Sequence, residues 1–227
     1  DFDNPIVTES FNGLVSAYAA GGDAKAAVQS QIFCTGGSND GSCAASGIER
    51  IESMTINGPS IETSGVDIFA DYRMELGAGF ATFGLDVSHT LKYEQDAYYK
   101  SGVLVGASYD AAGFLNASRT ARPLPDLKGR VFGEYSLDQH NFLVYANHIT
   151  SYEDERYAGT KVDSQTTYDL HYQYSFMDDQ ARVTVSAMNV TDEDPPLARL
   201  DLSYDGYTHN AFGRMIKVGV EYTIGEG

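Results

Sequence analysis

Two segments near the end of the chain decide its fold: ARVTVSAMNVTDEDPP at residues 181–196 and GRMIKVGVEYTI at residues 213–224. In the second segment Ile216, Val218 and Val220 alternate with mixed side chains, and the first segment alternates in the same way. This period of two predicts adjacent β-strands that share one apolar face. Such a pair needs a larger sheet. Whether lipid or other protein covers the apolar face decides between a membrane protein and a secreted module.

The composition favours strands and turns over helices. The chain has 227 residues, with 23 Gly, 16 Tyr and 11 Phe but no Trp, and only 42% of its residues are hydrophobic. No run of about 18 or more apolar residues occurs, which excludes a membrane-spanning helix. A spanning barrel is still possible, because its alternating strands have low mean hydropathy. The net charge of −17 argues against nucleic acid as a partner, and indicates either a soluble surface or an acidic vestibule that attracts cations.

Several other stretches alternate with the same period. They are residues 65–75, 80–93, 127–135 and 166–176, and residues 142–152 fit two opposite faces equally well. Residues 65–75 place Asp67, Asp71, Arg73 and Glu75 on the side that would face inward. A water-filled or protein-filled interior tolerates such charges, whereas the dry core of a sandwich would leave them unpaired.

The connections between these stretches have two lengths. Those at one end of the predicted strands are short, at residues 76–79, 137–140 and 177–180. Those at the other end are long, at residues 8–47, 94–123, 153–165 and 192–213. Short turns at one rim and long loops at the other are typical of the wall of an outer-membrane barrel. Within the first long loop, residues 13–33 favour a surface helix that is interrupted at Gly21 and Gly22.

Cys34 and Cys43 are the only cysteines, and they close a short loop rich in Gly and Ser. This pattern favours a disulfide in an oxidising compartment over two unpaired thiols. The spacing matches no zinc-binding pattern, because no second Cys or His pair is available.

The motifs of this chain resemble the C-terminal part of a TonB-dependent outer-membrane receptor, and the resemblance covers essentially the whole chain. The motifs that carry it are Gly65-Val66-Asp67, Asn189-Val190-Thr191-Asp192 followed by Pro195-Pro196, and Gly213-Arg214.

The resemblance implies an all-β fold: about seven to eight strands of a 22-stranded antiparallel transmembrane β-barrel, with short periplasmic turns and long extracellular loops. Residues 1–227 would be the C-terminal portion of that barrel, without the plug domain, and residues 8–47 would be an extracellular loop with a helix and the disulfide. The function implied is active uptake of an iron-siderophore, cobalamin or an oligosaccharide across the bacterial outer membrane. The partners implied are membrane lipid and, through the N-terminal plug, the TonB energy-transducing system.

The two ends of the chain suggest a piece of a longer protein. The first residues are acidic and resemble the end of a strand, so we expect the chain to begin inside a larger protein. The family usually ends on an aromatic residue, whereas this chain ends in Gly225-Glu226-Gly227.

Candidate ligand contacts are polar aromatics and charged side chains in the long loops, which suit sugars and siderophores alike. They are Tyr109, Arg119, Tyr152, Arg156, Tyr157, Tyr204, Tyr207 and His209. Packing within the loops is the alternative interpretation for each of them.

The sequence predicts no enzyme, because no nucleophile elbow, phosphate-binding loop or other catalytic motif occurs. We likewise expect no cofactor and no metal site. Residues 201–206 only faintly resemble a calcium loop, and an acidic turn explains them better.

Two other functions remain open. A secreted all-β binding or adhesion module, for example a β-sandwich, would need to bury the charges of residues 65–75. A passive porin would share the barrel wall but would lack energy coupling.

Overall fold

The computed structural model describes residues 2–3, 5–177 and 180–223, and it is mostly β-strand with antiparallel pairing. The chain divides into two compact units. The first contains residues 1–64, 91–124 and 154–158, and the second contains residues 65–90, 125–153 and 159–227. In the part of the chain that the structure describes, no helix combines the length and the hydropathy needed to cross a membrane.

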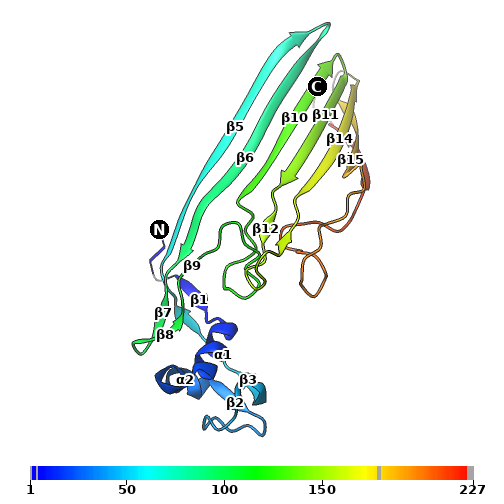
Figure 1. The fold of residues 1–227 in the computed structure, drawn as a ribbon. Helices are drawn as coiled ribbons and strands as arrows, with labels where there is room; N and C mark the ends of the chain where they lie inside the picture. Colours follow the sequence, from blue (N-terminus) through cyan, green and yellow to red (C-terminus); the bar gives the residue numbers. More distant parts are fainter. Residues whose placement is uncertain (1, 4, 178–179, 224–227) are drawn as a thin grey trace. The chain divides into compact units, whose positions relative to one another are not determined.

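Long strands that follow one another in the sequence are neighbours in one sheet (Figure 1). Their order is β5 (Ile61–Leu76), β6 (Gly79–Gln95), β10 (Leu127–Leu137), β11 (His140–Ile149), β14 (Gln165–Phe176), β15 (Ala181–Met188) and β16 (Met215–Tyr222). The prediction of an antiparallel, all-β sheet is therefore confirmed at this level.

The strand register gathers the apolar side chains of the sheet on one face, which we call the apolar face. Val144 of β11 lies opposite Leu170 of β14, and Val185 of β15 lies opposite Val218 of β16. The face remains open to solvent, because Val218 is 64% and Val220 is 76% exposed. The apolar face comprises Phe83, Leu85, Val131, Phe142, Val144, Tyr168, Leu170, Val183, Val185, Ile216, Val218 and Val220.

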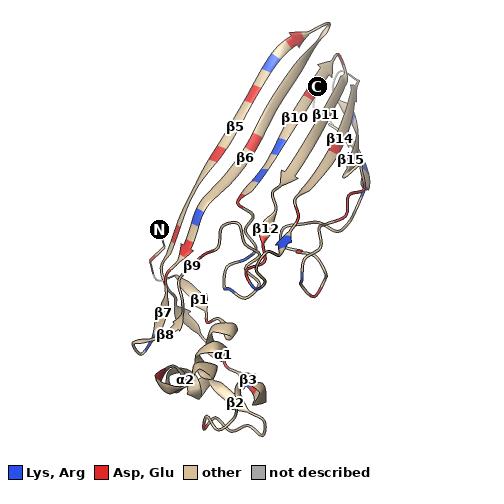
Figure 2. Cartoon of the chain, in the orientation of Figure 1, with Lys and Arg blue, Asp and Glu red and all other residues tan. Residues whose placement is uncertain are grey.

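The opposite, polar face carries side chains that bond to one another across the strands. Arg130 pairs with Asp86 at 3.2 Å, and the Asn147 amide donates to Asp169 at 2.9 Å. Charged residues recur along β5, β6 and β10 (Figure 2). The register also resolves the ambiguous stretch in β11, because Tyr145 contacts Phe132 and His171 on the polar face while Val144 lies on the apolar face.

Two of the three predicted short connections are confirmed. Residues 77–78 join β5 to β6, and residues 138–139 join β10 to β11. Gly77 and Asp138 adopt positive φ angles of 64° and 49°, which these tight turns require. The third short turn includes residues 178–179, and the predicted last strand includes Ile224; these positions lie outside the described residues.

The first unit is built from short elements that either precede β5 or lie between β6 and β10 in the sequence. They are β1 (Ile6–Thr8), α1 (Phe11–Ala20), α2 (Gly22–Val28), η1 (Gln29–Gln31), β2 (Ile32–Cys34), η2 (Ala45–Gly47), β3 (Ile48–Ile51), β4 (Thr55–Asn57), β7 (Tyr98–Lys100), β8 (Val103–Gly106) and β9 (Tyr109–Asp110). β1 pairs with β4, β2 with β3, and β7 with β8. In the second unit the loop after β11 adds a short pair, β12 (Tyr152–Glu153) and β13 (Lys161–Val162).

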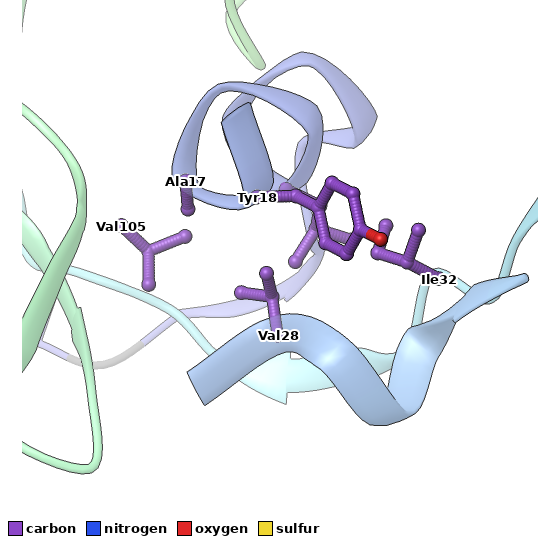
Figure 3. Packing of buried hydrophobic residues seen from close by; sticks show 6 residues of the cluster. Ala17, Tyr18, Val28, Ile32 and Val105 are labelled. Atoms are coloured by element: carbon purple, nitrogen blue, oxygen red, sulfur yellow. The ribbon is translucent and has the colours of Figure 1, made fainter. Parts of the chain in front are cut away.

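Each of the two helices contributes one face to the core of the first unit and leaves its other residues partly or fully exposed, which agrees with the predicted surface helix. Leu14 and Tyr18 of α1 pack with Val28, Ile32 and Val105, and each of these side chains is buried (Figure 3). The helix breaks at the predicted glycine pair, because residue 21 has a φ of 77° that a side chain would strain.

The predicted disulfide is confirmed. It joins Cys34 at the end of β2 to Cys43, and the two Cα atoms are 5.8 Å apart. The Tyr18 hydroxyl donates to the carbonyl oxygen of Cys43 at 3.0 Å, which ties the disulfide loop to α1.

Candidate ligand-binding site

A cavity of about 450 Å³ in the first unit is the best-formed candidate site. Leu14 of α1 and Val105 of β8 give it an apolar lining, and both also belong to the buried core. Ser10 caps α1 by accepting a hydrogen bond from the Gly13 N–H at 3.3 Å, which fixes the start of the helix beside the cavity. The volume suits a small organic ligand.

A buried carboxylate, Glu9, organises one wall of this cavity. One of its oxygens accepts from Lys100 Nζ at 2.9 Å and from the Tyr98 hydroxyl at 3.1 Å. The other accepts from the Gln31 amide and from the Met54 N–H. Each oxygen of Glu9 therefore accepts two hydrogen bonds. Through them Glu9, which directly follows β1, connects β1 to η1 and β7.

Burial raises the pKa of Glu9, but hydrogen bonds from Lys100, Gln31 and the Met54 N–H outweigh burial, and the net pKa lies below the ordinary value. Glu9 is therefore ionised near neutral pH, and the charge of Lys100 balances it. Burial and the neighbouring Glu9 carboxylate raise the pKa of Tyr98 to about 12, so its hydroxyl remains a donor.

The other wall carries Arg119. Its guanidinium lies over the rings of Tyr109, at 4.7 Å, and Phe114, at 4.8 Å. One nitrogen, Nη1, donates to the Asp110 carbonyl oxygen at 2.9 Å and to Asn116 Oδ1 at 3.1 Å. These partners hold the guanidinium plane and neither is a carboxylate, although the charges of Arg119 and Glu155 attract each other.

The loop that supplies Arg119 is held by two side chains. The buried Asn116 amide donates to the carbonyl oxygens of Ala111, Phe114 and Arg122, at 2.9 to 3.1 Å. Glu155 Oε1 accepts from the N–H and the hydroxyl of Ser118, at 2.7 and 2.8 Å. Burial raises the pKa of Glu155, but the bonds from Ser118 prevail and the net pKa is lowered.

A second polar cluster is buried in the second unit. The Tyr152 hydroxyl donates to Asp205 Oδ2 at 2.7 Å and lies 3.1 Å from His209 Nε2. His209 Nδ1 lies 2.8 Å from Gln165 Oε1, and it is the donor because a carbonyl oxygen can only accept. Burial lowers the pKa of His209, against the opposing charge of Asp205.

The eight residues predicted to contact ligand therefore fall into separate places. Tyr109 and Arg119 line the cavity together. Tyr152 and His209 are buried in the second cluster, where their bonds hold loops together. For all eight residues a role in binding stays a prediction.

Arg156 pairs with Asp154 through two bonds of 2.9 Å and lies 5.4 Å from the ring centre of Tyr157. Tyr204 forms an isolated β-bridge with Leu197, and Tyr207 is 69% exposed. The contacts of Arg156, Tyr157 and Tyr204 agree with loop packing, the alternative weighed from the sequence.

Sequence reasoning missed the buried carboxylate Glu9 and its partner Lys100. The two are separated by 91 residues, and no local pattern connects them. In the faint calcium-like segment, Asp205 bonds instead to Tyr152 and to the Tyr207 N–H. Among the described residues, no group of three or more His, Cys, Asp or Glu side chains could hold a metal ion.

Comparison with known proteins found no matching family, no matching curated protein and no matching solved structure.

Proposed function

We propose that this chain forms part of the barrel wall of a TonB-dependent outer-membrane receptor that takes up a scarce nutrient. One observation carries the proposal: the sheet exposes apolar side chains along one face while the other face holds bonded polar side chains. In water the exposed apolar face would be unfavourable, by about 25 cal/mol for each Å² left uncovered. Lipid would cover it without any further protein.

The polar face supports the same proposal. Pairs such as Arg130 with Asp86 and Arg182 with Glu221 stay partly hydrated, because every one of these side chains is more than two-fifths exposed. A watery or plug-filled lumen suits such pairs, and the dry core of a secreted sandwich does not.

The lengths of strands and loops add independent support. β10 and β14 have 11 and 12 residues, enough to cross a bilayer as tilted strands. The proposal requires further strands beside β5 and β16, because lipid leaves no partner for an open sheet edge. The sequence resemblance favours a 22-stranded barrel with an N-terminal plug, and such a barrel would supply the further strands.

Residues 1–227 contain no Trp, so an introduced Trp is the only one within them, which makes a direct test possible. We would compare Val144→Trp with Tyr145→Trp, two adjacent positions at the same depth of β11 whose side chains occupy opposite faces. The full-length protein, with any Trp outside residues 1–227 replaced by Phe, would be reconstituted into vesicles that contain brominated lipid. We expect strong fluorescence quenching for Val144→Trp and little for Tyr145→Trp. Equal quenching, or none at either position, would contradict the membrane-wall proposal and favour a secreted module.

Energy coupling separates a receptor from a passive porin. Cells that carry the intact gene should accumulate one of the three nutrient classes above the external concentration, and a protonophore should stop this accumulation. Uptake that only equilibrates the two sides, and that a protonophore leaves unchanged, would instead indicate a porin.

A further inference from the structure

The cavity of the first unit contains one charged group that no carboxylate pairs with directly. Arg119 is held through Nη1, and in the described part of the chain its Nε and Nη2 have no hydrogen-bond partner. Other arginines, such as Arg130 and Arg182, make ion pairs with carboxylates. A guanidinium with a free pair of donors offers a planar fork that matches a carboxylate.

Apart from Arg119, the side chains that line the cavity have no net charge once Lys100, the partner of Glu9, is included. The only acidic side chain in the lining, Glu9, is balanced by Lys100 at 2.9 Å. The polar groups otherwise are hydroxyls and amides, together with the tyrosine rings of Tyr98 and Tyr109. The hydroxyl and amide side chains are Thr8, Ser10, Asn12, Ser16, Gln95, Ser108, Ser118 and Thr120.

Each part of this lining selects a chemical feature of the ligand. Tyrosine rings pack against the apolar faces of sugar rings and similar bodies while their hydroxyls remain available. Hydroxyl and amide side chains exchange hydrogen bonds with ligand hydroxyls. The half-buried Arg119 has a guanidinium fork that is not hydrogen-bonded to any described carboxylate, and this favours a ligand with one negative group over a ligand with none.

We infer that this cavity binds a hydroxylated ligand that carries a carboxylate, with Arg119 holding the carboxylate and the hydroxyl and amide side chains holding the ligand hydroxyls. Two ligands of the proposed transport function share that chemistry: a saccharide that contains a uronic acid, and an iron chelate of a hydroxycarboxylic acid. Cobalamin is disfavoured, because its corrin body is far larger than a cavity of about 450 Å³. The inference rests on the proposed function only in taking this ligand to be the transported nutrient.

The test measures binding to the wild-type, full-length protein by isothermal titration calorimetry. The probes are galacturonic acid disaccharide, the neutral galactose disaccharide and ferric citrate. We expect at least one of the two acids to bind about 10-fold or more tightly than the neutral disaccharide, as one charge-assisted bond would give. Preference for the uronate indicates a saccharide ligand, and preference for ferric citrate indicates an iron chelate. No preference for either acid would overturn the inference without any variant.

Variants then assign the effect to Arg119. Arg119→Gln should weaken binding of the preferred acid by about 10- to 100-fold, and Arg119→Lys, which keeps the charge but loses the fork, should be intermediate. Arg50→Gln is the matched control, because Arg50 lies in the same unit, pairs with Glu52 at 2.6 Å and does not line the cavity. Hydrogen exchange of α1 checks that each variant folds. Unchanged binding in a folded Arg119→Gln variant would contradict the inference.

These outcomes are independent of the membrane test. Failure of acid binding leaves the quenching difference between positions 144 and 145 intact, whereas equal quenching at those positions removes the transport role and leaves acid binding intact.

Discussion

Replacing Glu9 by Gln should destabilise the first unit, because the amide cannot accept every bond that the carboxylate accepts. Each oxygen of Glu9 accepts two hydrogen bonds, from Lys100 and Tyr98 on one side and from Gln31 and the Met54 N–H on the other. In either orientation the new NH₂ group would face two donors. The substitution keeps the size of the side chain, so the effect isolates hydrogen bonding and charge.

The magnitude follows from the two hydrogen bonds that are lost with the replaced oxygen. A hydrogen bond to a charged group contributes about 1.5–3 kcal/mol. The Glu9 side chain is only 1% exposed, whereas that of Lys100 is 21% exposed and can recover part of its hydration. We therefore expect the free energy of unfolding of the first unit to fall by about 2–4 kcal/mol.

Amide hydrogen exchange of α1 and α2 measures this free energy locally. Glu52→Gln is the control, because Glu52 is exposed and pairs with Arg50 on the surface, where such a pair contributes about 0–1 kcal/mol. The reasoning would be refuted if Glu9→Gln changed the opening free energy no more than Glu52→Gln does.

The same variant carries a pH dependence with a defined sign. The folded-state pKa of Glu9 lies below its ordinary value of 4.5, so the unfolded state binds more protons in that range. The stabilisation is complete above that ordinary value and is lost as the pH falls through the folded-state pKa. Glu9→Gln should remove this part of the acid sensitivity, which exchange measurements at pH 6 and at lower pH would detect.

Two further predictions concern the disulfide and the sheet. Reducing the bond between Cys34 and Cys43 should lower the stability of the first unit by about 2–3 kcal/mol, since it closes a short loop; exchange in α1 should rise while exchange in β14 stays unchanged, and equal changes in both would contradict a local effect. Gly84→Ala should impair folding of the sheet, because a Cβ there would lie 2.4 Å from the Phe132 ring and 2.9 Å from the Ala70 carbonyl oxygen. Gly219→Ala has open space and serves as the control; equal thermal stability of the two variants in detergent would contradict the clash.

The sequence by itself predicted the strands, their connections and the disulfide. Side-chain alternation is a local property of an extended chain, so Ile216, Val218 and Val220 indicate a shared face without knowledge of any partner strand. The break at Gly21 is also local, because a positive φ depends on the residue type. The two cysteines permitted only one intramolecular pairing.

Only the tertiary structure decided which face of β11 is apolar and which side chains form the sites. Val144 and Tyr145 satisfy the period equally well, and pairing with Leu170 selects the face of Val144. Glu9 and Lys100, 91 residues apart, meet because the helices fold back on β7 and β8. Side-chain alternation can be recognised from adjacent residues alone. A buried charge is stable only where other segments supply its partners, so the residues next to Glu9 in the sequence could not reveal that it is buried.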